Sequence, residues 1–166
     1  MATVALGHFR SAAVDCQTLP EVARRMDSRI RPYLGDEDFV TALLAEIRED
    51  GTCHVVSCGH PPALLASADR LTAVGQADST PLGLGAAPAQ VTVTLAVGDR
   101  LLLYTDGILE ARRPDRSFVE LPSLLGPLSS GDLHSVLARV LAALRTAVGD
   151  DLGDDLAMLV AEYSPE

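Results

Sequence analysis

Apolar residues recur with helical spacing in three parts of the chain. Residues 2–16 place apolar side chains on one side of a helix, and Val22, Met26 and Ile30 then recur every fourth residue. The clearest helical pattern lies near the C-terminus, at positions i, i+3, i+4, i+7, i+8, i+11 and i+15: Leu133, Val136, Leu137, Val140, Leu141, Leu144 and Val148. We expect a helix in each of these segments.

The residues next to these patterns predict where two helices begin. Thr18 and Glu21 have the spacing of a capping box, and Pro20 lies at an early helical position. Asp132 precedes the last helix and is a good N-cap residue. Gly35 occupies the place where a C-terminal cap of the second helix would lie.

Between the helical segments, short apolar runs alternate with turn residues. Glu49-Asp50-Gly51 marks a hairpin between the first two runs, and Gly98-Asp99 marks another between the last two. We expect strands over 39–47, 53–58, 63–67, 71–74, 91–97, 100–105 and 156–163, with a long loop over 75–90 and a looser region over 112–130. Strands joined by short turns predict a mainly antiparallel α+β domain spanning residues 1–166.

One of these runs ends in a carboxylate. Leu101-Leu102-Leu103-Tyr104-Thr105 is an unbroken run that predicts a strand buried on both faces, and Asp106-Gly107 follows it directly. A carboxylate at the end of a buried strand is costly unless a metal ion or a hydrogen-bonded turn pairs with it. Gly107 would let the backbone bend sharply there.

A second acidic site precedes the last strand, where Asp154 and Asp155 stand before Leu156. If the two strands are antiparallel neighbours, Asp106 and this acidic pair lie at the same edge of the sheet. Such carboxylates repel one another unless a cation bridges them, and oxygen ligands favour Mg²⁺ or Mn²⁺. The alternative is that Asp106-Gly107 is only a turn and 149–155 only a solvated loop.

Charge and composition exclude several functions. The net charge of −10 argues against nucleic-acid binding. The chain has no Lys, which excludes Schiff-base catalysis and a Walker-type phosphate loop. It has neither a membrane-spanning apolar run nor a signal peptide at Met1, so we expect a cytoplasmic location for this segment.

The three cysteines are Cys16, Cys53 and Cys58. A zinc site is one interpretation of the cysteine and histidine side chains of Cys53, His54, Cys58 and His60. However, residues five apart on one strand point to opposite faces, so their sulfur atoms diverge. We therefore expect buried, reduced thiols that pack as small hydrophobic groups.

Five motifs occur in the order found in one known family. The chain resembles the metal-dependent protein serine/threonine phosphatases (the PPM family), and is most similar to the bacterial sporulation stage II E branch. The motifs are Asp38–Leu44, Cys58–Leu65, Pro81–Leu84, Gly98–Arg112 and Asp154–Val160.

The resemblance implies a fold and a reaction. The family fold is an antiparallel β-sandwich flanked by helices, with two Mn²⁺ or Mg²⁺ ions at one edge. A metal-activated water attacks phosphoserine or phosphothreonine on a protein, which in this branch is an anti-anti-sigma factor. The resemblance assigns Asp106 and Asp154 as metal ligands, with Asp155 as the second choice for the latter. Gly59-His60-Pro61-Pro62 is read as structural, with His60 as a general acid the alternative.

The match departs from the family at its start. The family begins with strands and a Gly-Asp-Val-x-Gly-x-Gly segment that supply a bridging carboxylate, and these 166 residues contain neither. We expect the first strands to be missing, which leaves sheet edges unpaired. A longer parent protein, a genuine remnant and a deliberate fragment all remain open.

Two functions therefore compete. One is a phosphatase, and the other is an inactive phosphatase-like module that binds a phosphoprotein or a regulatory partner. The sequence also leaves open whether a homodimer replaces the missing strands.

Overall fold

The computed structural model describes residues 1–68, 70–76, 79–148 and 156–165. These residues form two compact units, one made of Met1–Pro62 and Val74–Thr94 and the other of Ala63–Ala73 and Leu95–Glu166. Each unit has one antiparallel sheet with helices against it, so the expected α+β class is confirmed. Within the described residues, every helix is too short or too polar to span a lipid bilayer.

The first unit begins with two helices, α1 (Ala2–Asp15) and α2 (Leu19–Ile30). The predicted capping box is present: the Thr18 side chain accepts a hydrogen bond from the Glu21 backbone, and the Glu21 side chain accepts one from the Thr18 backbone. A short 3-10 helix, η1 (Arg31–Tyr33), continues α2. The expected cap of α2 at Gly35 is wrong, because the C-cap of α2 is Arg31 and Gly35 is not among the glycines with positive φ.

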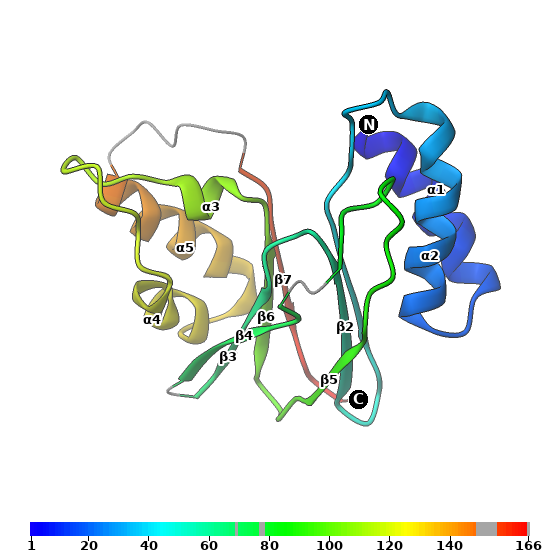
Figure 1. Cartoon of the computed structure of the whole chain (residues 1–166). Helices are drawn as coiled ribbons and strands as arrows, with labels where there is room; N and C mark the ends of the chain where they lie inside the picture. Colours follow the sequence, from blue (N-terminus) through cyan, green and yellow to red (C-terminus); the bar gives the residue numbers. More distant parts are fainter. Residues whose placement is uncertain (69, 77–78, 149–155, 166) are drawn as a thin grey trace. The chain divides into compact units, whose positions relative to one another are not determined.

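The sheet of the first unit has three strands in the order β1-β2-β5. They are β1 (Ala42–Ile47), β2 (Thr52–Cys58) and β5 (Val91–Thr94). The hairpin at Glu49-Asp50-Gly51 is confirmed by the antiparallel pairing of β1 with β2. The two helices cover one face of this sheet (Figure 1), where Leu44, Val56 and Cys58 join the helix residues in one hydrophobic core.

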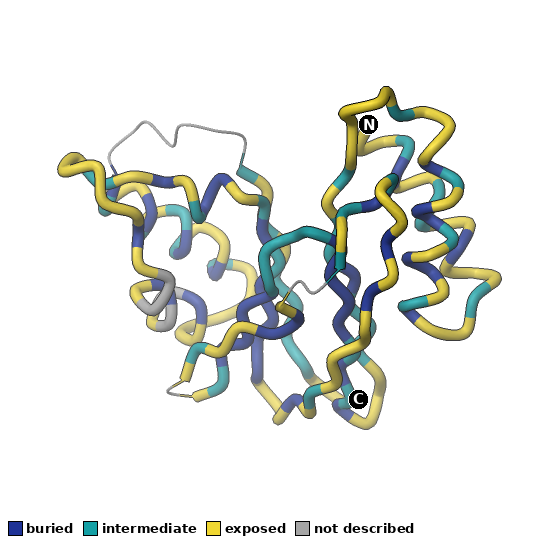
Figure 2. Tube along the Cα trace, viewed as in Figure 1, coloured by how far each residue is buried: buried dark blue, intermediate teal, exposed yellow. Residues whose placement is uncertain are grey.

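The sheet of the second unit has four strands in the order β4-β3-β6-β7. They are β3 (Ala63–Ser67), β4 (Arg70–Val74), β6 (Arg100–Tyr104) and β7 (Met158–Glu162). β6 lies between β3 and β7 and pairs with both in antiparallel fashion. Figure 2 colours most residues of β6 as buried, and both Leu101 and Leu102 are fully buried, as the apolar run predicted.

Helices cover the sheet of the second unit. They are α3 (Gly107–Glu110), the 3-10 helix η2 (Leu121–Leu124), α4 (Leu125–Ser129) and α5 (Leu133–Val148). The predicted cap of α5 is confirmed, because the Ser135 backbone donates to the Asp132 carboxylate at 3.1 Å. Along α5, Val136, Val140, Leu144 and Val148 are buried in the core. Leu133 and Leu137 are 39 % exposed, so the buried stripe is narrower than the apolar pattern predicted.

The expected hairpin between residues 91–97 and 100–105 is wrong. β5 ends at Thr94 and pairs with β2, in the other sheet, and Val97 is exposed. The turn itself exists, since the Ala96 backbone donates to the Asp99 carboxylate at 2.9 Å. β3 and β7 occupy both edges of β6, so no edge of β6 is available to β5.

Candidate functional site

The first candidate residue, Asp106, lies directly after β6 and is the N-cap of α3. Its side chain makes no capping hydrogen bond and is exposed. Its backbone carbonyl accepts from the Glu110 N–H at 2.9 Å, which closes the single turn of α3. Ile108 is fully buried in the core and fixes the turn against the sheet. The fold therefore holds the Asp106 backbone and leaves its carboxylate exposed.

Gly107 does not act as expected. It is the first residue of α3 and is not among the glycines with positive φ. The turn from β6 into α3 therefore does not use the conformational freedom of glycine that the sequence argument gave to Gly107, which is a buried residue with helical backbone geometry.

The end of β6 is joined to the beginning of β7 by two hydrogen bonds. The Thr105 N–H donates to the Ala157 carbonyl at 3.1 Å, and the Ala157 N–H donates to the Thr105 hydroxyl at 3.0 Å. The register continues into the strands, where Tyr104 faces Met158. The antiparallel neighbours assumed in the sequence argument are therefore present, and Asp106 lies at the sheet edge where β7 begins.

Asp154 and Asp155 lie outside the described residues. Within the described part of the chain, the structure brings together no group of three or more His, Cys, Asp or Glu side chains that could hold a metal ion. The assignment of Asp106, Asp154 and Asp155 as metal ligands stays a prediction.

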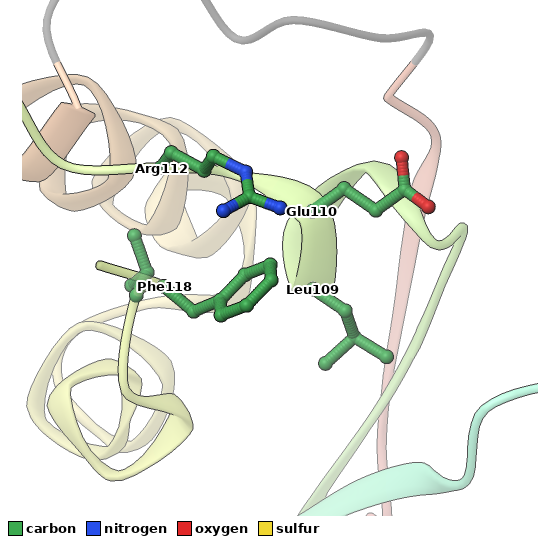
Figure 3. Close-up of a pocket in the computed structure, with 5 residues that line it drawn as sticks. Leu109, Glu110, Arg112 and Phe118 are labelled. Carbon is green, nitrogen blue, oxygen red and sulfur yellow. The ribbon is translucent and has the colours of Figure 1, made fainter. Parts of the chain in front are cut away.

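A pocket of about 600 Å³ opens beside α3. Leu109, Glu110, Arg112, Phe118 and Val119 line it, and Figure 3 shows the Arg112 guanidinium over the Phe118 ring. The distance from the guanidinium carbon to the ring centroid is 4.2 Å. The pattern of residues 112–130 predicts only a looser region, and neither the pocket nor the contact of Arg112 with Phe118 could be read from it.

The motif around His60 is held by local hydrogen bonds in the first unit. The Ser57 hydroxyl donates to the His60 carbonyl at 2.7 Å, and Nδ1 of His60 lies 2.9 Å from the Pro61 carbonyl. Because a carbonyl only accepts, Nδ1 carries the proton in that contact. Gly59 has a φ of +65°, and a Cβ there would lie 2.5 Å from Cγ of Pro81. Gly59 is thus required because the Cys58–Leu65 and Pro81–Leu84 motifs pack closely against each other at this point.

A buried carboxylate that the sequence analysis missed holds the Pro81–Leu84 motif in place. Oδ1 of Asp27 accepts hydrogen bonds from the backbone N–H groups of Gly83, Gly85 and Ala86 at 2.7, 3.1 and 3.0 Å. The available signal was an acid among the buried positions of α2.

Cys53 and Cys58 are fully buried, and Cys58 belongs to the core of the first unit. Burial raises the pKa of the Cys58 thiol to about 11 and also raises the pKa of Cys53. Both sulfur atoms are therefore protonated at neutral pH, which fits the expectation of thiols that pack as small hydrophobic groups.

The comparison with family models decides what kind of domain this is. The model of stage II sporulation protein E (SpoIIE) matches residues 1–164. The chain belongs to the SpoIIE family. This confirms the resemblance based on the five motifs and makes the chain a member of a PPM (PP2C-type) phosphatase family.

Solved structures share the fold of this SpoIIE-family chain. The RsbU and RsbW domains of Rv1364c from Mycobacterium tuberculosis match with a TM-score of 0.77 and 24 % identity, over 98 % of this chain and 47 % of that one. The PP2C phosphatase domain of SpoIIE from Bacillus subtilis, with a fragment of its regulatory domain, matches with a TM-score of 0.80 and 18 % identity, over 96 % of this chain and 48 % of that one. The SpoIIE-family chain thus spans about half the length of these two chains.

A third match concerns metal. The catalytic domain of the serine/threonine protein phosphatase PstP, in complex with two manganese ions, matches with a TM-score of 0.71 and 14 % identity. It covers 96 % of this chain and 79 % of that one. PstP thus shows that a domain of this fold binds manganese.

Proposed function

We propose that residues 1–166 form a metal-dependent protein serine/threonine phosphatase domain that hydrolyses phosphoserine or phosphothreonine on a protein. The observation that carries this proposal is the position of Asp106. It is held by a buried strand and a fixed helical turn, yet its own carboxylate is exposed and takes no part in capping. A side chain placed in this way is suited to bind a cation.

Asp106 would share the ion with Asp154, and with Asp155 as the second choice beside it. The two strands that flank these acids are paired through Thr105 and Ala157, and Asp155 is two residues before Ala157 in the sequence. All three donors are carboxylate oxygens, which suit Mn²⁺ or Mg²⁺ better than zinc. When bound, such an ion lowers the pKa of a water molecule and offsets negative charge on a phosphoryl group.

Residues around Asp106 hold its backbone in position for binding the ion. The Thr105–Ala157 hydrogen bonds join the two strands at this end of the sheet, and the fully buried Ile108 anchors α3 in the core. Because the Asp106 side chain starts from this rigid turn, it loses little conformational freedom when it binds a cation.

The substrate class follows from the family. We propose a phosphorylated regulatory protein of the anti-anti-sigma type, acted on in the cytoplasm. The match to a chain with adjoining RsbU and RsbW domains supports a role among such regulators. The net charge of −10 gives no support to a nucleic-acid partner.

The first experiment compares the chain with its Asp106→Asn variant. Mn²⁺ binding is measured by calorimetry, and phosphate release from a phosphoserine peptide is measured with and without Mn²⁺. We expect binding and release in the parent chain and a loss of at least roughly tenfold in both for the variant. Asp36→Asn, which changes an exposed acid of the other unit, is the matched control and should change neither.

Equal Mn²⁺ binding by the parent chain and Asp106→Asn would contradict the assignment of Asp106. Mn²⁺ binding without phosphate release would contradict the phosphatase proposal. It would favour the alternative of an inactive phosphatase-like module that binds a phosphoprotein.

A further inference from the structure

The pocket beside α3 is built by a small hairpin that follows that helix. Arg112 and Phe118 pair as an antiparallel bridge, and the Arg113 N–H donates to the Ser117 carbonyl at 2.8 Å. The next residues inward, Ala111 and Val119, are buried and joined by a 3.1 Å backbone hydrogen bond. The hairpin is therefore anchored in the core at its base, and its bridge residues are presented at the surface.

The two bridge residues make a surface with an apolar floor and a cationic edge. Phe118 is 52 % exposed, although it is one of only three phenylalanines in the chain. The Arg112 guanidinium lies over its ring and donates from Nη1 to the Arg116 carbonyl at 3.3 Å. Among the described residues, no carboxylate lies within ion-pair distance of Arg112. Its other N–H groups are available to a partner.

The acidic residue of the pocket does not neutralise this arginine. Figure 3 shows the Glu110 carboxylate directed away from the Phe118 ring, while Leu109 adds a second apolar side chain. The pocket thus combines a fixed positive group with an exposed apolar surface. This combination suits an apolar side chain carried by a negatively charged segment.

The pocket lies close to the proposed metal ligand. α3 has four residues and begins just after Asp106, so the helix places Leu109 about 4.5 Å and Glu110 about 6 Å further along its axis. An extended peptide advances by roughly 3.3 Å per residue. A peptide whose phosphate lies at Asp106 therefore reaches the pocket with a side chain two or three positions away.

We propose that this pocket binds the segment of the phosphoprotein substrate that flanks the phosphorylated residue. An apolar side chain two or three positions from the phosphoserine lies on Phe118 and Leu109, and Arg112 binds the backbone carbonyls or acidic groups beside it. The proposal deepens the phosphatase function and rests on it. It makes Phe118 and Arg112 determinants of substrate choice that take no part in the chemical step.

The test separates binding in the pocket from hydrolysis. The probes are matched pairs of phosphoserine peptides. In each pair, one position two or three residues before or after the phosphoserine carries Leu in one peptide and Gly in the other. Backbone chemical shifts of the ¹⁵N-labelled chain are followed during titration in EDTA, where no divalent ion is available. For one of these positions, we expect the peptide with Leu to change the amide chemical shifts of Leu109, Arg112 and Phe118. The matching peptide with Gly should leave these chemical shifts unchanged.

The variants are Phe118→Ala and Arg112→Gln, with the exposed Arg145→Gln on α5 as the charge-matched control. With Mn²⁺, we expect each pocket variant to raise KM for the Leu peptide by about tenfold, the scale of one apolar contact, while kcat changes less than about twofold. Hydrolysis of p-nitrophenyl phosphate, which is too small to reach the pocket, should be the same in all variants.

Two results would overturn the pocket proposal: equal shifts with Leu and Gly peptides, or an unchanged KM in both pocket variants. Absence of p-nitrophenyl phosphate hydrolysis in the parent chain would instead contradict the phosphatase function. Peptide-dependent shifts in EDTA would still support binding in the pocket in that case, so the two failures are distinguishable.

Discussion

Oδ1 of Asp27 lies 2.7 Å from the backbone nitrogen of Gly83, although 56 positions separate the two residues. Asp27 is a buried residue of α2, and Gly83 lies in the loop that contains the Pro81–Leu84 motif. The same oxygen accepts two further backbone N–H groups from that loop, and Arg31 pairs with Oδ2 at 3.0 Å. One carboxylate thus fixes a whole loop to the helix.

Replacement of Asp27 should therefore destabilise the first unit. Asp27→Ala leaves three backbone N–H groups without an acceptor, so we expect the free energy of unfolding to fall by roughly 2–4 kcal/mol. Arg31→Ala is the control and should cost less than about 1 kcal/mol, because the Arg31 side chain is 58 % exposed. Urea denaturation measures both, and equal effects of the two variants would contradict this account.

Arg100 has a comparable role in the second unit. Its buried guanidinium donates to Glu162 at 2.6 Å and to the carbonyls of Leu128, Ser130 and Gly131 at 2.9, 3.0 and 2.6 Å. Arg100→Met removes all these donors and leaves the Glu162 carboxylate unpaired, so we expect a loss of about 3–5 kcal/mol in urea denaturation.

Glu162→Gln keeps an acceptor on β7 and should cost clearly less than Arg100→Met. A result in which the two variants are equally destabilised would mean that the carbonyl contacts of Arg100 contribute nothing.

Two glycines with positive φ give a matched test of close packing. Gly98 has a φ of +86°, and a Cβ at this position would have no other heavy atom within 4 Å, whereas a Cβ on Gly59 would meet Pro81 at 2.5 Å. We expect Gly98→Ala to cost about 1 kcal/mol from the backbone alone. Gly59→Ala should cost about 2–4 kcal/mol, because overpacking is added to the backbone cost. Thermal unfolding of the two variants provides the comparison.

The buried thiol of Cys58 should make stability fall at alkaline pH. Its pKa is raised by burial from 9.0 to about 11, so the unfolded chain loses this proton at a lower pH than the folded chain does. The folded state then binds more protons, and stability decreases as the pH rises from about 9 to about 11. At most roughly 3 kcal/mol is involved.

Urea denaturation at a series of pH values measures this slope. Cys58→Ala removes the titrating group and should flatten the slope, although it lowers stability at every pH by leaving a small cavity. A slope that is the same with and without Cys58 would assign the alkaline loss to other groups.

The sequence by itself determined most of the local structure. The capping box at Thr18, the N-cap at Asp132 and the turn at Gly51 act through neighbouring residues, so their chemistry can be read from short segments. The buried strand that precedes Asp106 was predictable for the same reason, since its unbroken apolar run needs no distant partner to be recognised.

The tertiary structure alone decided which segments become neighbours. β5 pairs with β2 because both edges of β6 are taken, and the local turn at Gly98-Asp99 carries no information on that competition. The acceptor role of Asp27 likewise depends on backbone N–H groups of a loop that lies 56 to 59 residues further along the chain. Local patterns set the elements through short-range hydrogen bonds and periodicity, whereas pairing and burial depend on contacts between residues far apart in the chain.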